Sequence, residues 1–265
     1  MTINFLIAPD FSPEFYAGWH FLNTRLQRLI DAPVHLFMAT NAEEQRKAID
    51  SDTVDIIYAN PFDAAKLMRE LGYLPVVRPV NRFDEMVISS SAESEIKSLQ
   101  DIKPGMSVLC TENYDVKLIA LRLLEAVDIE EKDLTWISSE SFSAVARGLI
   151  QGEGDIGLFM SSAYYKLTSL TRSRLNLLIE SKINDLYHVV LLHPRHASML
   201  ETLQKAFSTM HETVAGEMLL EDIGLSEGFS ILENEEVELL IDLIETLRDY
   251  TPALLFYLII SNATC

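Results

Sequence analysis

Short apolar runs alternate with amphipathic segments over most of this chain, and no other feature limits its fold as strongly. In the first part, the apolar runs predict strands at residues 3–7, 34–37, 54–58 and 74–80. Apolar residues spaced by three and four, and residues that start helices, predict helices at residues 13–31, 41–51 and 61–71. Strands that alternate with helices at this density are typical of βαβ units in a parallel sheet.

The same order of elements begins again after residue 100. Apolar runs predict strands at residues 107–110, 134–137, 156–159 and 175–179. The segments between them predict helices at residues 114–126, 141–151 and 162–170. The repetition therefore predicts an α/β fold with two similar lobes.

Two extended, β-rich segments, residues 82–89 and 186–193, lie at the expected lobe boundaries. Two such crossings would divide the first lobe, because the chain would return to it after the second lobe. We expect the first lobe at 1–83 and 186–250, the second at 84–185, and a C-terminal tail at 251–265. Helices expected at 197–210, 214–223 and 235–248 would cover the first lobe.

The charge of the chain limits its partners. The 21 Lys and Arg residues stand against 40 Asp and Glu residues, which gives a formal net charge of −19. Such a surface repels nucleic-acid phosphates and anionic lipid headgroups, so we expect neither as a partner. The alternative is that the negative charge has no role in partner choice and only maintains solubility.

Motifs for metals and cofactors are missing from the sequence. Cys110 and Cys265 lie far apart, and the six histidines form no metal-ligand pattern. The chain has no glycine-rich nucleotide-binding motif. We therefore expect no metal and no cofactor.

The amino terminus favours a cytoplasmic location. The apolar stretch after Met1 is short, and no Lys or Arg precedes Arg25, whereas a secretory signal needs a basic segment and a longer apolar one. No run of about 18 apolar residues predicts a membrane span. A chain whose leader has been removed would look the same and would be periplasmic.

The expected ligand site follows from the predicted fold. In parallel α/β lobes, ligands bind at the carboxyl ends of strands, beside helix amino termini. Those ends are the segments 9–15, 39–41, 58–62, 111–115, 138–142 and 160–164. Their hydroxyls and free N–H groups suit an anionic or carbonyl-bearing ligand, or the polar residues act only as helix N-caps.

Four segments resemble the phosphate/phosphonate-binding components of ABC importers. They are Asp-Ile-Ile-Tyr-Ala-Asn-Pro-Phe at 55–62, Ser-Leu-Gln-Asp-Ile-Lys-Pro-Gly at 98–105, and the segments 142–157 and 217–229. The segments occur in the family's order, and the resemblance covers about residues 3–245. It implies a type II periplasmic-binding-protein fold with two lobes, two hinge strands and one ligand cleft.

The chain departs from this family at the ligand turn. The resemblance implies a Ser/Thr-rich turn at the start of the first helix of the second lobe, where this chain has Glu112 and Asp115. Glu140 and Ser141 stand where the family has a histidine. Two carboxylates would repel a dianion and favour a zwitterion, a cation or a neutral molecule, or they only stabilise the helix amino terminus.

The candidate ligand-binding residues lie at or beside these strand ends. Aromatic faces would enclose an organic or cationic group, Arg82 would pair with a carboxylate, and Asn184 would offer polar contacts from the hinge. Tyr58 is expected at the cleft rim, with packing beneath the next helix as the alternative. The full set is Phe11, Tyr58, Asn60, Phe62, Arg82, Thr111, Glu112, Asn113, Tyr114, Ser139, Ser141 and Asn184.

The sequence offers no nucleophile, base and acid in a catalytic pattern, so we predict a noncatalytic protein that closes two lobes on a small molecule. Such a protein would serve an ABC permease as a solute-binding component, or a signalling protein as a sensor module. The alternative is a cytoplasmic enzyme on the same fold, with chemistry of the menaquinone- or thiamine-precursor type. Glu112 would then be a general base.

Overall fold

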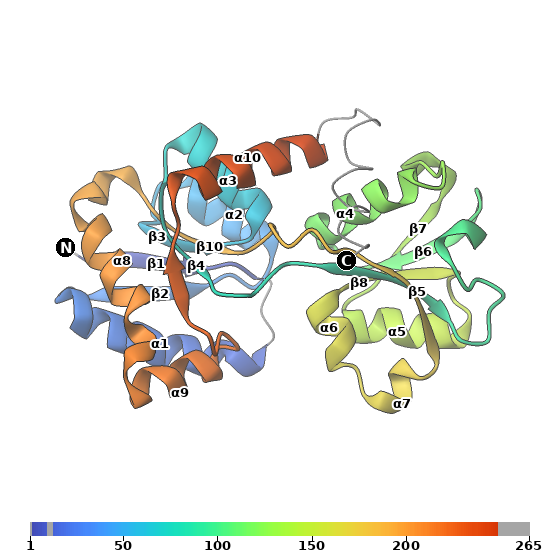
Figure 1. Cartoon of the computed structure of the whole chain (residues 1–265), viewed down its shortest axis with the longest axis horizontal. Helices are drawn as coiled ribbons and strands as arrows, with labels where there is room; N and C mark the ends of the chain where they lie inside the picture. Colours follow the sequence, from blue (N-terminus) through green and yellow to red (C-terminus); the bar gives the residue numbers. More distant parts are fainter. Residues whose placement is uncertain (1, 10–12, 249–265) are drawn as a thin grey trace. The chain divides into compact units, whose positions relative to one another are not determined.

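The structure is a computed structural model, and it describes residues 2–9 and 13–248. The chain forms two compact units (Figure 1). Of the described residues, the first unit contains 2–9, 13–83 and 187–244, and the second contains 84–186 and 245–248. Phe11 and the tail expected at 251–265 lie outside the described residues.

The first unit is built on a sheet of six strands in the order β11-β4-β10-β3-β1-β2. These strands are β1 (Ile3–Ile7), β2 (Val34–Met38), β3 (Ile56–Ala59), β4 (Leu74–Pro79), β10 (Val189–Leu192) and β11 (Phe229–Ile231). β1 is parallel to β2 and β3, as the alternating pattern predicts. β10 is antiparallel to both β3 and β4, so the sheet is mixed.

Helices cover both faces of this sheet, with α1, α8 and α9 on one face and α2 and α3 on the other (Figure 1). Trp19 and Leu22 of α1 and Phe207 of α8 pack with Phe5 of β1 in one buried cluster. The helices are η1 (Pro13–Phe15), α1 (Tyr16–Ile30), α2 (Ala42–Asp50), α3 (Pro61–Leu71), η4 (Pro194–Met199), α8 (Leu200–Ser208), η5 (Met210–Glu212), α9 (Val214–Asp222) and α10 (Asn234–Arg248), whose residues from Glu245 belong to the second unit.

The second unit has a sheet of five strands in the order β7-β6-β8-β5-β9. β6 is parallel to β7 and β8, and β5 is antiparallel to β8 and β9. The strands are β5 (Met86–Ser91), β6 (Ser107–Cys110), β7 (Thr135–Ser138), β8 (Ile156–Met160) and β9 (Leu175–Glu180). The helices are η2 (Leu99–Asp101), α4 (Tyr114–Glu125), η3 (Glu131–Asp133), α5 (Phe142–Gln151), α6 (Ser161–Lys166) and α7 (Ser169–Arg172).

The main differences from the sequence prediction are a divided helix, an omitted strand and irregular crossing segments, and the helix predicted at 197–210 begins as the 3-10 segment η4. The single helix predicted at 162–170 is two helices, because Leu167 and Thr168 are extended and the Thr168 hydroxyl caps α7 by accepting from the Thr171 N–H at 3.1 Å. The prediction omits β11, which has only three residues. The crossing segments are also partly irregular, since β5 begins at Met86 and β10 at Val189.

No helix among residues 2–9 and 13–248 is long and apolar enough to cross a membrane.

Close packing of α5 on β8 depends on Gly157. A Cβ atom at this position would lie 2.7 Å from Val145 Cγ1 and 2.8 Å from Leu149 Cδ1, which is closer than carbon atoms pack. Both neighbours are buried in the core cluster of the second unit. Gly157 therefore allows α5 to lie directly on the sheet.

We expect Gly157→Ala to lower the free energy of unfolding by about 1–3 kcal/mol, because the added methyl group overpacks the contact between α5 and β8. Urea unfolding followed by circular dichroism measures the change. Ser143→Ala on the exposed side of α5 is the matched control, and its effect should stay within about 0.5 kcal/mol. Equal stability of Gly157→Ala and the unaltered protein would contradict this packing.

Candidate functional site

The carboxyl ends of β6, β7 and β8 meet at one edge of the sheet in the second unit, because these strands run parallel. The Ser139 N–H donates to the Cys110 carbonyl at 2.8 Å, which extends the pairing of β6 and β7 by one residue. Thr111, Ser139 and Ser141 therefore follow adjacent strands at the same edge. The structure thus brings together these three predicted residues.

Two of the predicted residues act as helix N-caps. Asn113 Oδ1 accepts from the Val116 N–H at 3.0 Å at the start of α4, and Ser141 Oγ accepts from the Ala144 N–H at 3.2 Å at the start of α5. The Asn113 side-chain amide also lies 3.8 Å from Met160 Sδ. This contact brings the beginning of α4 next to the end of β8.

Ser161, which follows β8, has two properties that cannot be read from the sequence. Its side chain is 8% exposed, and Oγ has no hydrogen-bond partner among the described residues. The sequence predicts that the hydroxyl-rich segment 160–164 lies at a strand end, but burial and an unpartnered hydroxyl are properties of the folded chain. Ser161 therefore joins the candidate site.

Asn184 lies beside the start of β5 in the second unit. Its backbone is left-handed, at φ 59°, and its N–H donates to Glu85 Oε1 at 2.7 Å. The other carboxylate oxygen of Glu85 accepts from the Ser181 hydroxyl, and Ser181 Oγ accepts from the Met86 N–H at 2.9 Å. Glu85 thus holds the backbone turn at Asn184 in place. The side chain of Asn184 is exposed.

The carboxyl edge of the sheet in the first unit carries Asn60. Its Oδ1 accepts from the Asp63 N–H at 2.8 Å, so Asn60 is the N-cap of α3. The Asp63 carboxylate accepts from the side-chain amides of Asn60 at 3.1 Å and Gln45 at 2.5 Å. A carboxylate of the chain itself therefore lies at the amino terminus of α3.

Tyr58 does not lie at an exposed rim, and the expectation that it does is wrong. Its side chain is 1% exposed, and its ring centroid lies 5.0 Å from those of both Trp19 and His188. All residues of β3 are buried, because β3 lies between β1 and β10 and helices cover both faces. Phe62 is also buried, within the first turn of α3.

The remaining predicted residues are accessible. Arg82, which follows β4, and Glu112, which follows β6, are exposed. Tyr114, the first residue of α4, is 62% exposed.

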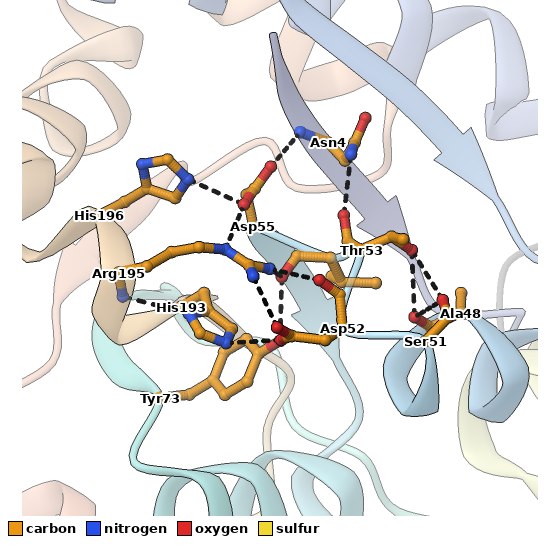
Figure 2. Close-up of polar contacts among 11 residues, drawn as sticks. Asn4, Ala48, Ser51, Asp52, Thr53, Asp55, Tyr73, His193, Arg195 and His196 are labelled. Atoms are coloured by element: carbon orange, nitrogen blue, oxygen red, sulfur yellow. Dashed lines mark hydrogen bonds and ion pairs between the residues drawn. The ribbon is translucent and has the colours of Figure 1, made fainter. Parts of the chain in front are cut away.

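A polar network that sequence analysis missed lies at the opposite edge of the sheet in the first unit (Figure 2). Asp55 immediately precedes β3, and Arg195 and His196 follow β10. The Asp55 carboxylate, which is buried, accepts from the Asn4 N–H, from Arg195 Nε and from His196 Nε2, each at 2.8 Å. The network therefore ties together the ends of β1, β3 and β10.

A second carboxylate extends this network. Asp52 pairs with Arg195 Nη1 at 2.9 Å and with His193 Nε2 at 3.0 Å. Tyr73 packs edge-on against the His193 ring, and its hydroxyl donates to the Val54 carbonyl at 3.0 Å. Burial raises the pKa of Tyr73 to about 12, so this hydroxyl stays protonated. No local sequence pattern pairs residues near 55 with residues near 195, which is why the network is visible only in the fold.

Burial alone would raise the pKa of the Asp55 carboxyl. The hydrogen bonds from the Asn4 N–H, Arg195 and His196, together with the positive charge that His196 can carry, outweigh burial and lower this pKa below its usual value. A carboxyl with a lowered pKa stabilises the folded state above its unfolded pKa. This stabilisation is lost as the pH falls through the folded pKa.

Comparison with known proteins identifies the family. A family model described as ABC transporter, phosphonate, periplasmic substrate-binding protein matches residues 5–237. The chain belongs to this family. Members of the family are substrate-binding proteins and not enzymes, as the sequence predicts. No curated protein sequence matches the chain.

Solved structures show the same fold at low sequence identity. PhnD1 from Prochlorococcus marinus in complex with methylphosphonate has a TM-score of 0.75 and 14% identity, and the match covers 94% of this chain and 99% of that one. XAC2383 from Xanthomonas citri bound to ATP has a TM-score of 0.72 and 12% identity, with the same coverage. The alkanesulfonate-binding protein SsuA from Xanthomonas axonopodis pv. citri bound to MOPS has a TM-score of 0.62 and 14% identity, and the match covers 93% of both chains. The prediction of a two-lobed type II periplasmic-binding-protein fold is confirmed.

We expect Asp55→Asn to lower the free energy of unfolding at pH 7 by about 1–3 kcal/mol, because it removes a buried carboxylate that accepts three hydrogen bonds, while the partly exposed Arg195 keeps Asp52 as a partner. The unaltered protein should also lose stability below about pH 4, and this part of its acid dependence should be absent from the variant. Urea unfolding between pH 3 and pH 7 measures both effects. Asp50→Asn, at an exposed position of α2, is the matched control, and an equal effect in the two variants would contradict the account.

We expect Tyr58→Ala to destabilise the first unit by about 3–5 kcal/mol, because it removes a fully buried ring. Tyr114→Ala removes the same atoms from an exposed position and should change stability by less than about 0.5 kcal/mol. Thermal and urea unfolding of the ligand-free variants measure the difference. Similar unfolding curves for the two variants would show that Tyr58 is not a core residue.

Proposed function

We propose that this chain is the noncatalytic solute-binding component of an ABC importer, that it works in the periplasm and that its partner is the importer's permease. The observation that carries the proposal is the family match, which spans residues 5–237 and so includes both sheets. The family is described as periplasmic, and we prefer that location to the cytoplasmic one that the amino-terminal sequence favours. The comparisons favour a transporter component over a sensor module or an enzyme.

We place the solute at the carboxyl ends of the parallel strands. In the second unit this edge carries the exposed ends of two helices and polar side chains that follow adjacent strands, and such an edge binds ligands in open α/β sheets. The proposed contacts in this unit are Thr111, Glu112, Asn113, Tyr114, Ser139, Ser141, Ser161 and Asn184. In the first unit the proposed contact is Arg82, Asn60 being buried at the start of α3, while Phe11 remains a prediction from the sequence.

The core residues at this edge have a supporting role in the proposal. Tyr58 and Phe62 are buried, so we assign them to the packing that fixes β3 and α3 and not to direct contact with the solute. Asn60 has the same role, because it is buried and its side chain accepts from the Asp63 N–H and donates to the Asp63 carboxylate at the start of α3. Closure of the two lobes on the solute stays a prediction from the sequence.

A ligand screen tests the proposal. Thermal unfolding should be measured with phosphonates, sulfonates, amino acids, organic cations and sugars, followed by titration calorimetry. We expect at least one solute to bind at one site per chain and to stabilise the protein by about 2.7 kcal/mol at 100 times its dissociation constant. The solute should be recovered unchanged after long incubation, because the protein is proposed to be noncatalytic.

A matched pair of variants locates the binding. Ser139→Ala should weaken binding of the selected solute, whereas Ser143→Ala on α5 should not. The loss should be about 1 kcal/mol, the usual value of one hydrogen bond. Failure of every solute class to bind would refute the proposed function, and equal binding by the two variants would refute the proposed location.

A further inference from the structure

We propose that this protein forms a two-fold symmetric dimer through the outer face of α1 and α9 in the first unit. This surface, the α1–α9 face, contains three exposed apolar side chains, Phe21, Val214 and Met218, between a basic helix and an acidic helix. The inference concerns a second copy of the chain as partner, and it does not depend on the proposed solute-binding function.

The two helices pack side by side and run antiparallel (Figure 1). At the start of α1, a Cβ atom at Gly18 would lie only 2.6 Å from the Asp222 carbonyl oxygen, at the end of α9. Further along α1, Arg25 Nη2 donates to Thr213 Oγ1 at 2.8 Å, at the start of α9. These two contacts fix both ends of the helix pair, so the α1–α9 face is one continuous surface.

The apolar side chains lie together on this surface. Val214 and Met218 are four residues apart, and so they share one side of α9. Phe21 lies between the two contact points on α1, level with Met218. Each of the three side chains is more than half exposed. Single exposed apolar residues are ordinary, whereas a group of them on one surface marks an interaction site.

The charges on the two helices are separated by sign. α1 contains Arg25 and Arg28 and no acidic residue, and α9 contains Glu217, Glu221 and Asp222 and no basic residue. Arg28, Glu217 and Glu221 are exposed, and none of them makes an ion pair with any residue that the structure describes. The α1–α9 face is therefore basic along one helix and acidic along the other.

Helix dipoles explain only part of this separation. A basic residue near the end of α1 and an acidic residue near the start of α9 are both stabilised, which accounts for Arg28 and Glu217. Glu221 and Asp222, however, lie in the last turn of α9, where the dipole disfavours a negative charge. The sign of the charge on α9 is thus not set by its dipole.

Charge complementarity selects a second copy as the occupant. A two-fold axis brings one surface against the same surface of the partner, so α1 of each copy would face α9 of the other. Each basic helix then meets an acidic one, and the apolar side chains meet at the centre. The net charge of −19 on each chain opposes association in general, so the local pattern has to overcome this repulsion.

Sedimentation of the full chain at about 0.15 M salt tests for the dimer, because long-range repulsion is screened there. We expect a monomer–dimer equilibrium. Met218→Asp should weaken association by at least on the order of tenfold, because it places a charge at the apolar centre. Leu71→Asp is the matched control, since Leu71 is exposed at the end of α3, on the other face of the sheet. It should leave association within about twofold.

Charge reversal tests the two-fold arrangement. Arg28→Glu makes α1 acidic at the interface, and the double variant Glu217→Lys with Glu221→Lys makes α9 basic. Each variant alone should associate on the order of tenfold more weakly, because like charges then face each other in both halves of the dimer. An equal mixture should form heterodimers, because the altered α1 of one variant faces the altered α9 of the other. Circular dichroism and urea unfolding check that each variant is folded.

Three results would overturn the proposal. They are a monomer at every protein concentration, equal association of Met218→Asp and Leu71→Asp, and the absence of heterodimers from the mixture of charge-reversed variants. None of these measurements needs a solute, so solute binding and dimer formation are tested separately.

Discussion

The antiparallel strand β10 is the constraint on which the first unit depends. It lies between β3 and β4, and all four of its residues are buried. The sheet of this unit therefore cannot form from the first 83 residues alone, because its third strand in spatial order comes from residues 189–192. The sheet of the second unit also contains an internal antiparallel strand, because β5 lies between β8 and β9 and is antiparallel to both.

This insertion explains the network around Asp55. β10 brings His193, Arg195 and His196 to the amino-terminal edge of β3, where Asp55 accepts hydrogen bonds from β1 and from the segment after β10. The charged groups lie at the edge opposite the carboxyl ends of β1 and β3. Stability and binding are thus assigned to opposite edges of one sheet, so variants of Asp55 and of the strand-end residues should have separable effects.

Periodicity predicts most elements of this fold, because buried strands and amphipathic helices leave clear patterns of apolar residues. The strand at 3–7, the helix at 61–71 and the strand at 107–110 have the predicted bounds. The break between α6 and α7 at Leu167 and Thr168 is not predicted by periodicity. A single polar cap in a short helical segment separates the two helices without changing the apolar pattern.

The candidate site is less predictable than the fold. Polar residues at strand ends, such as Asn113 and Ser141, can be found from the order of elements, but their roles as N-caps need the helix starts. The sequence predicts the wrong position for Tyr58, because a residue at a strand end is exposed only when its neighbours leave it uncovered, and here β1, β10 and α1 cover it. Pairs such as Asp55 with Arg195 are brought together only by the return of the chain after the second unit.

Hydrogen exchange with and without the solute selected by the ligand screen tests the central claim most directly. The account predicts that binding protects amides at residues 111–116 and 139–145, at the carboxyl ends of β6 and β7 and the starts of α4 and α5. Amides around Asp55 and His193, at the opposite edge of the first sheet, should exchange at unchanged rates. Protection confined to that opposite edge, with none at residues 111–116 and 139–145, would contradict the placement of the solute.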